Sequence, residues 1–425
     1  MSGPRVGCAG LTHLGLVSAV GFAATGFAVL GFDPDAGRVA AIEGARLPVV
    51  EPELDALFAA HRERLRFAAD AAALGACDVV YVAADVPTDE SGRSDLAAIA
   101  ALIDRVLPAL KATAVLVVLC QVPPGFTRSL KLPPERLYYQ VETLVFGRAV
   151  DRVLKPERFI VGCADPARPL PPAYAALLEA FGCPVLAMRY ESAELAKIAV
   201  NCCLAASVTV ANTLAGLAER IGADWAEIAP ALRLDRRIGP HAYLTPGLGL
   251  AGGNLERDLA TVLRLAGETG AEASVVRAFL DNSRHRRDWV LRVLHRELLD
   301  RRPDAVLGVL GLAYKENTDS TRNSPALALL DHLHPWQVRL FDPVVPATAA
   351  RHPRAVAADD ALDAASGADA LVVMTPWPEF RRLDPAALAG VLRGRLLVDP
   401  YRALDADAMA AAGLDHVTLG TPRDA

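Results

Sequence analysis

The chain has 425 residues, of which 52% are hydrophobic and 22% are charged, and its formal net charge is −6. At roughly 100–200 residues per domain, this length predicts two or three domains that each bury a core. The acidic balance argues against nucleic acid as a partner, because binding to a phosphodiester backbone requires a basic surface. The short basic run 284–287 is interpreted as one solvated helix face.

The seven cysteines are spread along the chain without a Cys-x-x-Cys pair. This pattern is typical of reduced thiols in a cytoplasmic protein and gives no zinc or other metal signature. The uncharged run 14–32 has the length of a membrane span, but glycines at 15, 21, 26 and 31 interrupt it. Their spacing favours a turn, a helix, a second turn and a strand, so we expect a soluble protein without a membrane segment.

The first part of the chain alternates between strand and helix patterns. Residues 5–9 predict a buried strand, 14–25 a helix and 28–33 a second strand, which together form a βαβ unit. Apolar runs separated by helical patterns such as 95–110 predict further strands at residues 79–83, 114–119, 159–162 and 185–188. Such alternation implies a mostly parallel sheet with helices on both faces.

The pattern changes at residue 192. Residues 192–221 predict one long Ala-rich helix, and helical patterns continue to about residue 299. Strand patterns return at residues 305–310, 337–341, 370–374 and 396–398. The predicted fold class is α/β, with two Rossmann-like doubly wound parallel-sheet domains joined by a long central helix and a helical region. The predicted domain boundaries are 1–190, 191–300 and 301–425.

The first predicted strand ends in the turn Gly10-Leu-Thr-His-Leu-Gly15. In a Rossmann turn, glycines allow the tight turn, the approach of a pyrophosphate and close helix packing. Here Thr12 takes the second glycine position. Asp33 ends the second strand, where a carboxylate binds a ribose 2′-hydroxyl and repels a 2′-phosphate. The turn therefore predicts a dinucleotide site that prefers NAD to NADP.

Other short motifs follow in a fixed order. They are Gly44, Pro48, Glu51-Pro52 and Leu54; Pro87-Thr-Asp-Glu-Ser-Gly92; Val122-Pro-Pro-Gly125; Ser192-Ala-Glu-Leu-Ala-Lys197 with Asn201; Asp235-Arg-Arg-Ile-Gly239; Pro246-Gly-Leu-Gly249, Gly252 and Asp258; and residues 311–325. In this order the motifs resemble the UDP-glucose/GDP-mannose dehydrogenase family over nearly the whole chain. The resemblance implies a cytoplasmic, NAD-dependent oxidoreductase that acts on a sugar nucleotide, a UDP- or GDP-hexose.

Two polar residues of the long helix are candidate catalytic residues. Lys197 and Asn201 lie four residues apart and so share one helix face. Lys197 is one of only five lysines and lies in an apolar stretch, which favours a functional role. An ammonium and a carboxamide stabilise negative charge that develops on a sugar oxygen. The resemblance implies that they act with Asp258 and a bound water, Asp258 accepting the proton of the C6 alcohol. A carboxylate at a helix N-terminus is the alternative interpretation of Asp258.

The resemblance also implies the other site residues. Those for NAD are Gly10, Thr12, His13, Leu14, Gly15, Asp33, Arg38, Pro87, Gln121 and Arg322. Those for the sugar nucleotide are Tyr243, Leu244, Gly247, Gly249, Gly252, Lys315 and Arg402, together with Arg237, which reaches the neighbouring subunit's site in a homodimer. By the same resemblance, residues 1–190 bind NAD, 191–300 dimerise and 301–425 bind the sugar nucleotide.

The sequence departs from the family at its reactive residue. The family's loop reads Gly-x-Gly-(Phe/Tyr)-Gly-Gly-Ser-Cys-Phe-Pro-Lys-Asp, whereas this chain reads Gly247-Leu-Gly-Leu-Ala-Gly-Gly-Asn-Leu-Glu-Arg-Asp258. Asn254 therefore replaces the nucleophilic cysteine, whose thiolate adds to the first-formed aldehyde in the family. A carboxamide cannot be that nucleophile. The family's segment with two glutamates keeps Glu142 here but has Phe146 for the second glutamate, and Gln121 replaces a threonine. By the resemblance, Glu142 and Asn254 complete the predicted catalytic positions.

We therefore favour a two-electron oxidation of an alcohol to a carbonyl, with one hydride transfer, in a specialised pathway. Three alternatives remain open. They are a four-electron 6-dehydrogenase that oxidises a hydrated aldehyde, an epimerase with transient oxidation, and a pseudoenzyme that only binds sugar nucleotide and NAD. Cys120 and the pair Cys202-Cys203 are interpreted as small hydrophobic residues rather than substitute nucleophiles.

Overall fold

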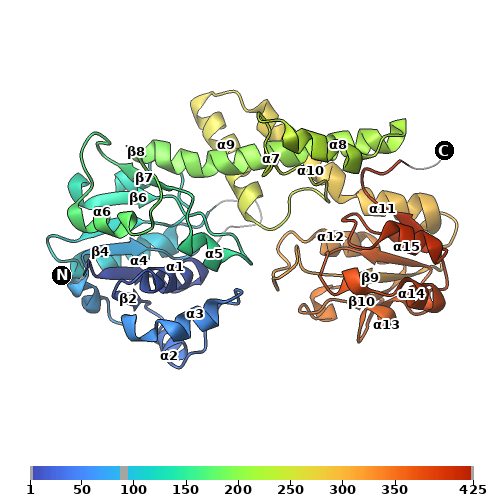
Figure 1. Cartoon of the computed structure of the whole chain (residues 1–425), viewed down its shortest axis with the longest axis horizontal. Helices are drawn as coiled ribbons and strands as arrows, with labels where there is room; N and C mark the ends of the chain where they lie inside the picture. The colour runs from blue at the N-terminus through green and yellow to red at the C-terminus, as the bar shows by residue number, and fades with distance from the viewer. Residues whose placement is uncertain (1–2, 87–93, 423–425) are drawn as a thin grey trace. The chain divides into compact units, whose positions relative to one another are not determined.

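The computed structural model describes residues 3–86 and 94–422. The chain forms two compact units, Met1–Val200 and Asn201–Ala425. The boundary between them falls inside the long helix α7 (Tyr190–Ile221) (Figure 1). The predicted long helix is thus present, and it begins two residues before the predicted start. The predicted three-domain boundaries stay a prediction.

The first unit is built on one sheet with the strand order β3-β2-β1-β4-β5-β6-β7-β8. Its strands are β1 (Val6–Ala9), β2 (Val29–Phe32), β3 (Leu65–Ala68), β4 (Val79–Val82), β5 (Val115–Val118), β6 (Leu137–Gln140), β7 (Phe159–Cys163) and β8 (Val185–Arg189). Its helices before α7 are α1 (His13–Ala24), α2 (Ala36–Glu43), α3 (Leu54–Ala60), α4 (Ala97–Val106), α5 (Ala149–Leu154) and α6 (Pro172–Glu179). The order of the first six strands is that of a doubly wound nucleotide-binding fold.

Helices cover both faces of this sheet, and the strands show why. Val79 and Tyr81 of β4 pack with α1 and α6 side chains, whereas Val80 and Val82 pack with α4 side chains. Successive side chains of a strand point to opposite faces, so a strand buried on both faces reads as a continuous apolar run. The pairing is parallel except between β6 and β7, which are antiparallel.

The second unit holds the end of α7, a group of helices and a second sheet (Figure 1). The sheet has the order β11-β10-β9-β12-β13-β14, with parallel neighbours throughout. Its strands are β9 (Val306–Leu310), β10 (Gln337–Phe341), β11 (Ala355–Ala357), β12 (Ala370–Val373), β13 (Leu396–Val398) and β14 (Asp415–Val417). The helices are α8 (Trp225–Leu234), α9 (Asn254–Thr269), α10 (Ser274–Arg287), α11 (Trp289–Leu294), α12 (Pro325–His332), α13 (Ala361–Ala365), α14 (Pro385–Val391) and α15 (Ala406–Ala411). The predicted α/β fold is confirmed, with one mostly parallel sheet and one wholly parallel sheet.

Two further sequence interpretations concerned the uncharged run 14–32 and the basic run 284–287. The uncharged run 14–32 forms α1 and β2, and α1 is buried in the first unit. By length and composition alone, one helix among the described residues, α7, would be long and apolar enough to cross a membrane. The interpretation of run 284–287 as one solvated face is wrong, because Arg286 is only 4% exposed. Its guanidinium points back onto α7, as described below.

Candidate functional site

The turn between β1 and α1 has the shape that a dinucleotide requires. Gly10 has φ of +89°, in the region that favours glycine, and α1 begins three residues later at His13. A Cβ atom on Gly15 would lie 1.7 Å from the backbone oxygen of Gly10, so only glycine fits. The backbone N–H groups at the start of α1 thus remain close to the turn, where they suit a pyrophosphate. The predicted NAD turn fits its cofactor.

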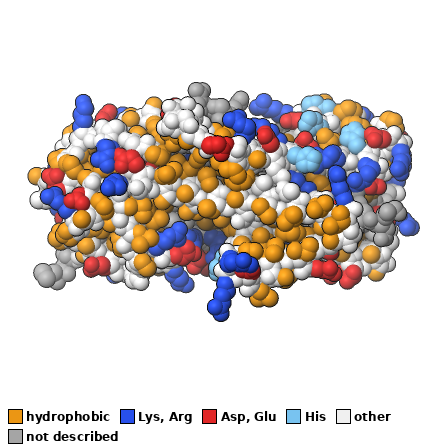
Figure 2. All heavy atoms as spheres, turned by 90° about the horizontal axis from the view of Figure 1, so that it is seen from above, with side chains coloured by type: hydrophobic (Ala, Val, Ile, Leu, Met, Phe, Trp, Pro, Cys, Tyr) orange, Lys and Arg blue, Asp and Glu red, His pale blue; other side chains and the backbone are white. Residues whose placement is uncertain are grey.

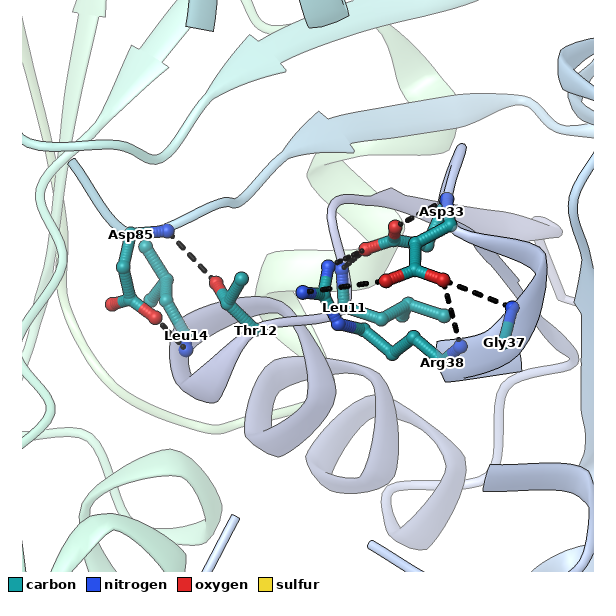
Figure 3. A network of polar contacts seen from close by, with 8 residues as sticks. Leu11, Thr12, Leu14, Asp33, Gly37, Arg38 and Asp85 are labelled. Atoms are coloured by element: carbon teal, nitrogen blue, oxygen red, sulfur yellow. Dashed lines mark hydrogen bonds and ion pairs between the residues drawn. The ribbon is translucent and has the colours of Figure 1, made fainter. Parts of the chain in front are cut away.

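Asp33 is buried at the end of β2 and holds the turn in place (Figure 3). Its carboxylate accepts hydrogen bonds from the N–H of Leu11 at 2.7 Å and from the N–H of Asp35 at 2.9 Å. Arg38 donates through Nη1 to Asp33 at 2.8 Å. A carboxylate has about four acceptor positions, so these three bonds leave one for a ribose hydroxyl. The structure brings the predicted residues Asp33 and Arg38 together.

A carboxylate that the sequence analysis did not single out lies at the N-terminus of α1. The N–H of Asp85 donates to Thr12 Oγ1 at 2.8 Å, and Asp85 Oδ2 lies 3.4 Å from the N–H of Leu14 (Figure 3). Thr12 at the second glycine position therefore ties the turn to the segment after β4. The Asp85 side chain faces the N–H groups that would bind a pyrophosphate, so its charge opposes that of the cofactor.

His13 contacts a buried glutamate and an exposed phenylalanine. Its Nε2 lies 2.7 Å from Glu51 Oε1, and its ring centroid lies 4.2 Å from that of Phe146. Glu51 also accepts hydrogen bonds from the N–H groups of Gly147 at 2.9 Å and Ala149 at 3.2 Å. Burial by itself raises the pKa of Glu51, but these hydrogen bonds outweigh it and hold the pKa below its ordinary value. Glu51 thereby links α1 to the segment after β6.

Two predicted catalytic residues of the first unit form an ion pair. Lys197 Nζ on α7 lies 3.2 Å from Glu142 Oε2, in the segment after β6. Both side chains are largely buried, at 13% and 12% exposure. Glu142 also accepts a hydrogen bond from the N–H of Leu144, which fixes its orientation. Lys197 is therefore not the solvated surface lysine that helices usually carry.

In the second unit, Asp258 is buried among hydrogen-bond donors. Asn201 Nδ2, one turn after Lys197 on α7, donates to Asp258 Oδ2 at 2.5 Å. Arg257 Nε lies 3.3 Å from Asp258 Oδ1, and Arg257 is itself 5% exposed. Asp258 is the fifth residue of α9, beyond the first turn, where the helix dipole has its main effect. A polar site therefore explains Asp258 better than a helix-capping role does. The sequence analysis missed the buried Arg257 because charged residues are usually exposed.

The glycine loop before α9 is held by two helices. The N–H of Gly247 donates to Asn212 Oδ1 on α7 at 2.8 Å, and the N–H of Leu250 donates to Ser283 Oγ on α10 at 2.8 Å. Gly249, between them, packs against the backbone of Ser283. Neither Asn212 nor Ser283 was predicted, because a polar residue within a helical pattern carries no signal of a distant loop.

The same loop contacts the segment after β9. A Cβ atom on Gly252 would lie 3.0 Å from the ring of Tyr314, and one on Gly253 would lie 2.8 Å from Arg322 Nε. Lys315 Nζ lies 5.6 Å from the centroid of the Tyr314 ring. The structure therefore brings the predicted residues Gly252, Lys315 and Arg322 into one region of the second unit.

Another cavity of the second unit joins two further predicted residues, Leu244 and Arg402. It has a volume of about 200 Å³ and is lined by Trp225, Ala226, Ala229, Pro230, Arg233, Leu244, Thr245, Pro246, Pro400, Tyr401, Arg402 and Leu419. Trp225 Nε1 donates to the backbone oxygen of Leu244 at 2.7 Å, and Arg402 Nη2 donates to Asp224 Oδ1 at 2.7 Å. An aromatic and apolar wall beside a guanidinium suits a nucleotide.

Some predicted residues make no such contacts. Asn254 is exposed at the first position of α9, and Gln121 is half-buried after β5. Arg237 is 88% exposed and pairs with Asp235 at 2.7 Å. Pro87 lies outside the described residues. Within the described ranges, no group of three or more His, Cys, Asp or Glu residues is placed to hold a metal.

Two parallel-sheet units with an NAD-type turn and buried polar pairs define a nucleotide-dependent oxidoreductase fold. Comparison with protein families finds three domains of one family. They are the NAD binding domain at residues 4–176, the central domain at 191–284 and the UDP binding domain at 308–406 of the UDP-glucose/GDP-mannose dehydrogenase family. The chain belongs to this family. It is an oxidoreductase, and its cofactor is NAD.

Curated relatives and solved structures are similar to this chain over nearly its whole length. The chain is 31% identical to UDP-glucose 6-dehydrogenase of Pseudomonas aeruginosa, over 97% of each chain. It is 27% identical to UDP-glucose 6-dehydrogenase TuaD of Bacillus subtilis, over 98% of this chain and 93% of the relative. A UDP-glucose dehydrogenase structure from Pyrobaculum islandicum matches with a TM-score of 0.83 and 28% identity, over 96% of this chain and 98% of the other.

Proposed function

We propose that this protein oxidises one alcohol of a UDP- or GDP-hexose to a carbonyl with a single hydride transfer to NAD. The observation that carries the proposal is Asn254, which stands where the family has its nucleophilic cysteine. An amide nitrogen is not a nucleophile toward an aldehyde under these conditions, so no covalent thiohemiacetal forms at this position. The first oxidation needs no such nucleophile, and the residues for it are retained.

Lys197, Asn201 and Asp258 handle the proton of the reacting alcohol in this proposal. Bound NAD supplies the hydride acceptor, and the turn 10–15 with Asp33 and Arg38 holds it. As the alcohol carbon loses its hydride, the hydroxyl proton passes to Asp258, directly or through a water. The Lys197 ammonium and the Asn201 carboxamide stabilise the negative charge that develops on the oxygen. The burial of Lys197 and Asp258 supports this role, because charge interactions strengthen away from water.

Cys120 and Cys202 do not offer a substitute for the missing thiol. Cys120 is fully buried, its Sγ lies 3.2 Å from the backbone oxygen of Val82, and burial raises its pKa to about 12. Burial also raises the pKa of Cys202. A thiol attacks as its thiolate, so both are poor nucleophiles at neutral pH. This supports one oxidation rather than two.

The nucleotide is bound by the second unit in this proposal. Lys315 beside Tyr314 and Arg402 beside the cavity at Leu244 supply cationic groups for the diphosphate and an apolar wall for the base. Arg237 is 88% exposed and is free to reach a partner subunit, once its surface pair with Asp235 opens.

We also propose that the protein is a cytoplasmic homodimer that pairs along α7. Val210, Leu214, Leu217 and Ile221 are 52%, 41%, 50% and 65% exposed, and their spacing of four, three and four residues puts them on one stripe. This is the spacing of a helix that packs against another helix. Figure 2 looks onto the side that carries α7 and shows hydrophobic side chains spread widely over it. A stripe of this kind also accounts for the apolar composition of α7.

A panel of sugar nucleotides incubated with NAD, read by product mass, tests the proposed reaction. A product two mass units lighter than its substrate supports it. A uronic acid favours the four-electron alternative, an isomer of unchanged mass favours the epimerase, and binding without turnover favours the pseudoenzyme. The retained contacts of Lys197 with Glu142 and of Asp258 with Asn201 argue against the pseudoenzyme. A protein that only binds sugar nucleotide and NAD does not need a positioned proton acceptor.

A further inference from the structure

A second polar cavity lies in the second unit, lined by residues that the proposed reaction does not use. The end of α7 and the helices α10 and α11 enclose a volume of about 450 Å³. Its lining, which we call the arginine pocket, consists of Asn212, Thr213, Gly216, Leu217, Glu219, Arg220, Asn282, His285, Arg286, Trp289, Arg292, Val293 and Arg296. The lining thus includes four arginines and one glutamate.

The innermost of these groups, Arg286, has unmet hydrogen-bonding capacity. Arg286 is 4% exposed, and its Nε and Nη2 atoms have no hydrogen-bond partner within the described parts of the chain. Its Nη1 lies so close to α7 that a Cβ atom on Gly216 would approach it to 2.7 Å. Burying donors of a cation without partners is costly, so such donors normally face a ligand.

The carboxylate of the pocket does not supply those partners. Glu219 Oε1 lies 3.8 Å from Arg286 Nη2, which is too long for a hydrogen bond. Glu219 instead accepts hydrogen bonds from Trp289 Nε1 at 3.2 Å and from the N–H of Gly420 at 3.0 Å. Its single charge is thus shared, and positive charge remains in excess.

Two of the other arginines of the pocket, Arg292 and Arg296, have hydrogen-bond partners of their own. Arg292 Nη1 donates to the backbone oxygen of His285 at 2.9 Å, and Arg296 pairs with the exposed Glu297 at 2.7 Å. An exposed pair of this kind contributes little. Burial lowers the pKa of both Arg286 and Arg292, against the opposite effect of the Glu219 carboxylate. Burial also lowers the pKa of His285, so its imidazole is neutral and the guanidinium groups carry the charge.

We propose that the arginine pocket binds a phosphate-class anion, at a site separate from that of the sugar nucleotide. Guanidinium groups bind phosphate oxygens through paired N–H donors, which is the geometry that Arg286 leaves unused. The half-buried Asn282 donates through Nδ2 to Thr213 Oγ1 at 3.0 Å, and its buried Oδ1 has no partner in the described residues. Its amide can turn so that Nδ2 donates at that position instead. A volume of about 450 Å³ between helices accommodates one or two phosphate groups but not a nucleic-acid strand.

Calorimetric titration of the full-length protein with inorganic phosphate and with pyrophosphate, at constant ionic strength, tests this proposal. We expect saturable binding to the wild type that becomes about tenfold weaker or more in the variant Arg292→Ala/Arg296→Ala, which removes only exposed side chains. The matched control Arg264→Ala/Arg277→Ala removes two exposed charges from α9 and α10 and should leave binding unchanged. Adenosine and uridine monophosphates, as additional probes, separate a nucleotide from free phosphate as the source of the anion.

A third variant, Lys315→Ala, separates the arginine pocket from the proposed diphosphate contact of the substrate. Phosphate binding should survive Lys315→Ala. The proposal is overturned if the wild type shows no saturable binding of phosphate or pyrophosphate, or if binding is lost in Lys315→Ala and unchanged in Arg292→Ala/Arg296→Ala. Because the readout is binding rather than turnover, it is independent of the proposed reaction.

Discussion

The carboxamide of Asn201 donates a 2.5 Å hydrogen bond to the carboxylate of Asp258, and both side chains are buried. An ionised carboxylate only accepts hydrogen bonds, so the NH₂ group of Asn201 must face Asp258. Arg257 approaches the other carboxylate oxygen at 3.3 Å. Asp258 is thus fixed in position by its neighbours before any substrate binds. This is what a proton acceptor requires, and it costs no reorganisation during the reaction.

Replacing Lys197, one helical turn before Asn201 on α7, tests the proposed roles of Lys197, Asn201 and Asp258 in proton transfer. We expect Lys197→Met to lower kcat by about 100-fold or more, because the charge that stabilises the developing oxyanion is lost. NAD binding, measured by calorimetry, should not change. The control Lys131→Met removes an exposed lysine and should have full activity. Turnover of Lys197→Met within twofold of the wild type would contradict the assignment.

The carboxylate of Asp85 should weaken NAD binding. Asp85 Oδ2 lies 3.4 Å from the N–H of Leu14, at the positive end of α1. Its removal in Asp85→Asn should favour a pyrophosphate by about 1 kcal/mol, which is roughly a fivefold lower Kd for NAD. Calorimetry at low salt gives the largest difference, since salt screens an exposed charge. A higher Kd in the variant would show that Asp85 instead binds the cofactor.

Glu51 should make stability depend on pH in the acid range. Its pKa is lower in the folded chain than the ordinary 4.5, so the ionised form stabilises the fold above about pH 4.5. This contribution is lost as the pH falls from there through the folded pKa. At neutral pH, Glu51→Gln should destabilise the chain by about 2 kcal/mol, because charged hydrogen bonds to His13 and two backbone N–H groups are weakened. Denaturant titrations should show the wild-type advantage shrinking below about pH 4.5, and a constant advantage down to pH 3 would contradict this account.

A charge on the stripe of α7 should separate the proposed dimer. We expect Leu214→Glu to convert the dimer to a monomer in light scattering, because a carboxylate in an apolar interface loses its hydration. Val275→Glu on α10 is the matched control, since this residue is 56% exposed but lies off the stripe. Wild-type protein that is already monomeric at micromolar concentration would rule out the stripe as the interface.

Restoring a thiol tests whether Asn254 limits the reaction. A cysteine at the first position of α9 lies at a helix N-terminus, which lowers the pKa of a thiol. We expect Asn254→Cys to react with iodoacetamide and to form some uronic acid, and Asn254→Cys/Phe146→Glu to form more. If Asn254→Cys is readily alkylated but forms no uronic acid, other residues at the reacting end of the site also prevent the second oxidation.

Much of the fold was predictable because buried parallel strands read as continuous apolar runs. The strands β1, β2, β4, β5, β7, β8, β9, β10, β12 and β13 were expected close to their observed positions. The strands β3, β6, β11 and β14 were missed. β3 and β14 are short and mix charged with apolar residues, so a local pattern does not separate them from loops.

The candidate site was predictable where a motif fixes local geometry. It was not predictable where the contact joins residues that lie far apart in the sequence. Asp33 follows from the turn and the end of β2, and Arg38 follows from the resemblance to the family. Glu51, which holds the N–H of Gly147, and Asn212, which holds that of Gly247, depend on contacts that only the folded chain creates. Arg286 was misread for a related reason, because a run of arginines says nothing about which of them faces a neighbouring helix.

The stoichiometry of NADH in a single turnover tests the central claim most directly. Enzyme in excess over a sugar nucleotide that turns over, with saturating NAD, should form one NADH per sugar nucleotide and a carbonyl product that hydroxylamine traps as an oxime. The absorbance of NADH and the mass of the oxime are read from the same sample. Two NADH per sugar nucleotide together with a uronic acid would show that the chain completes the four-electron oxidation without a cysteine at position 254.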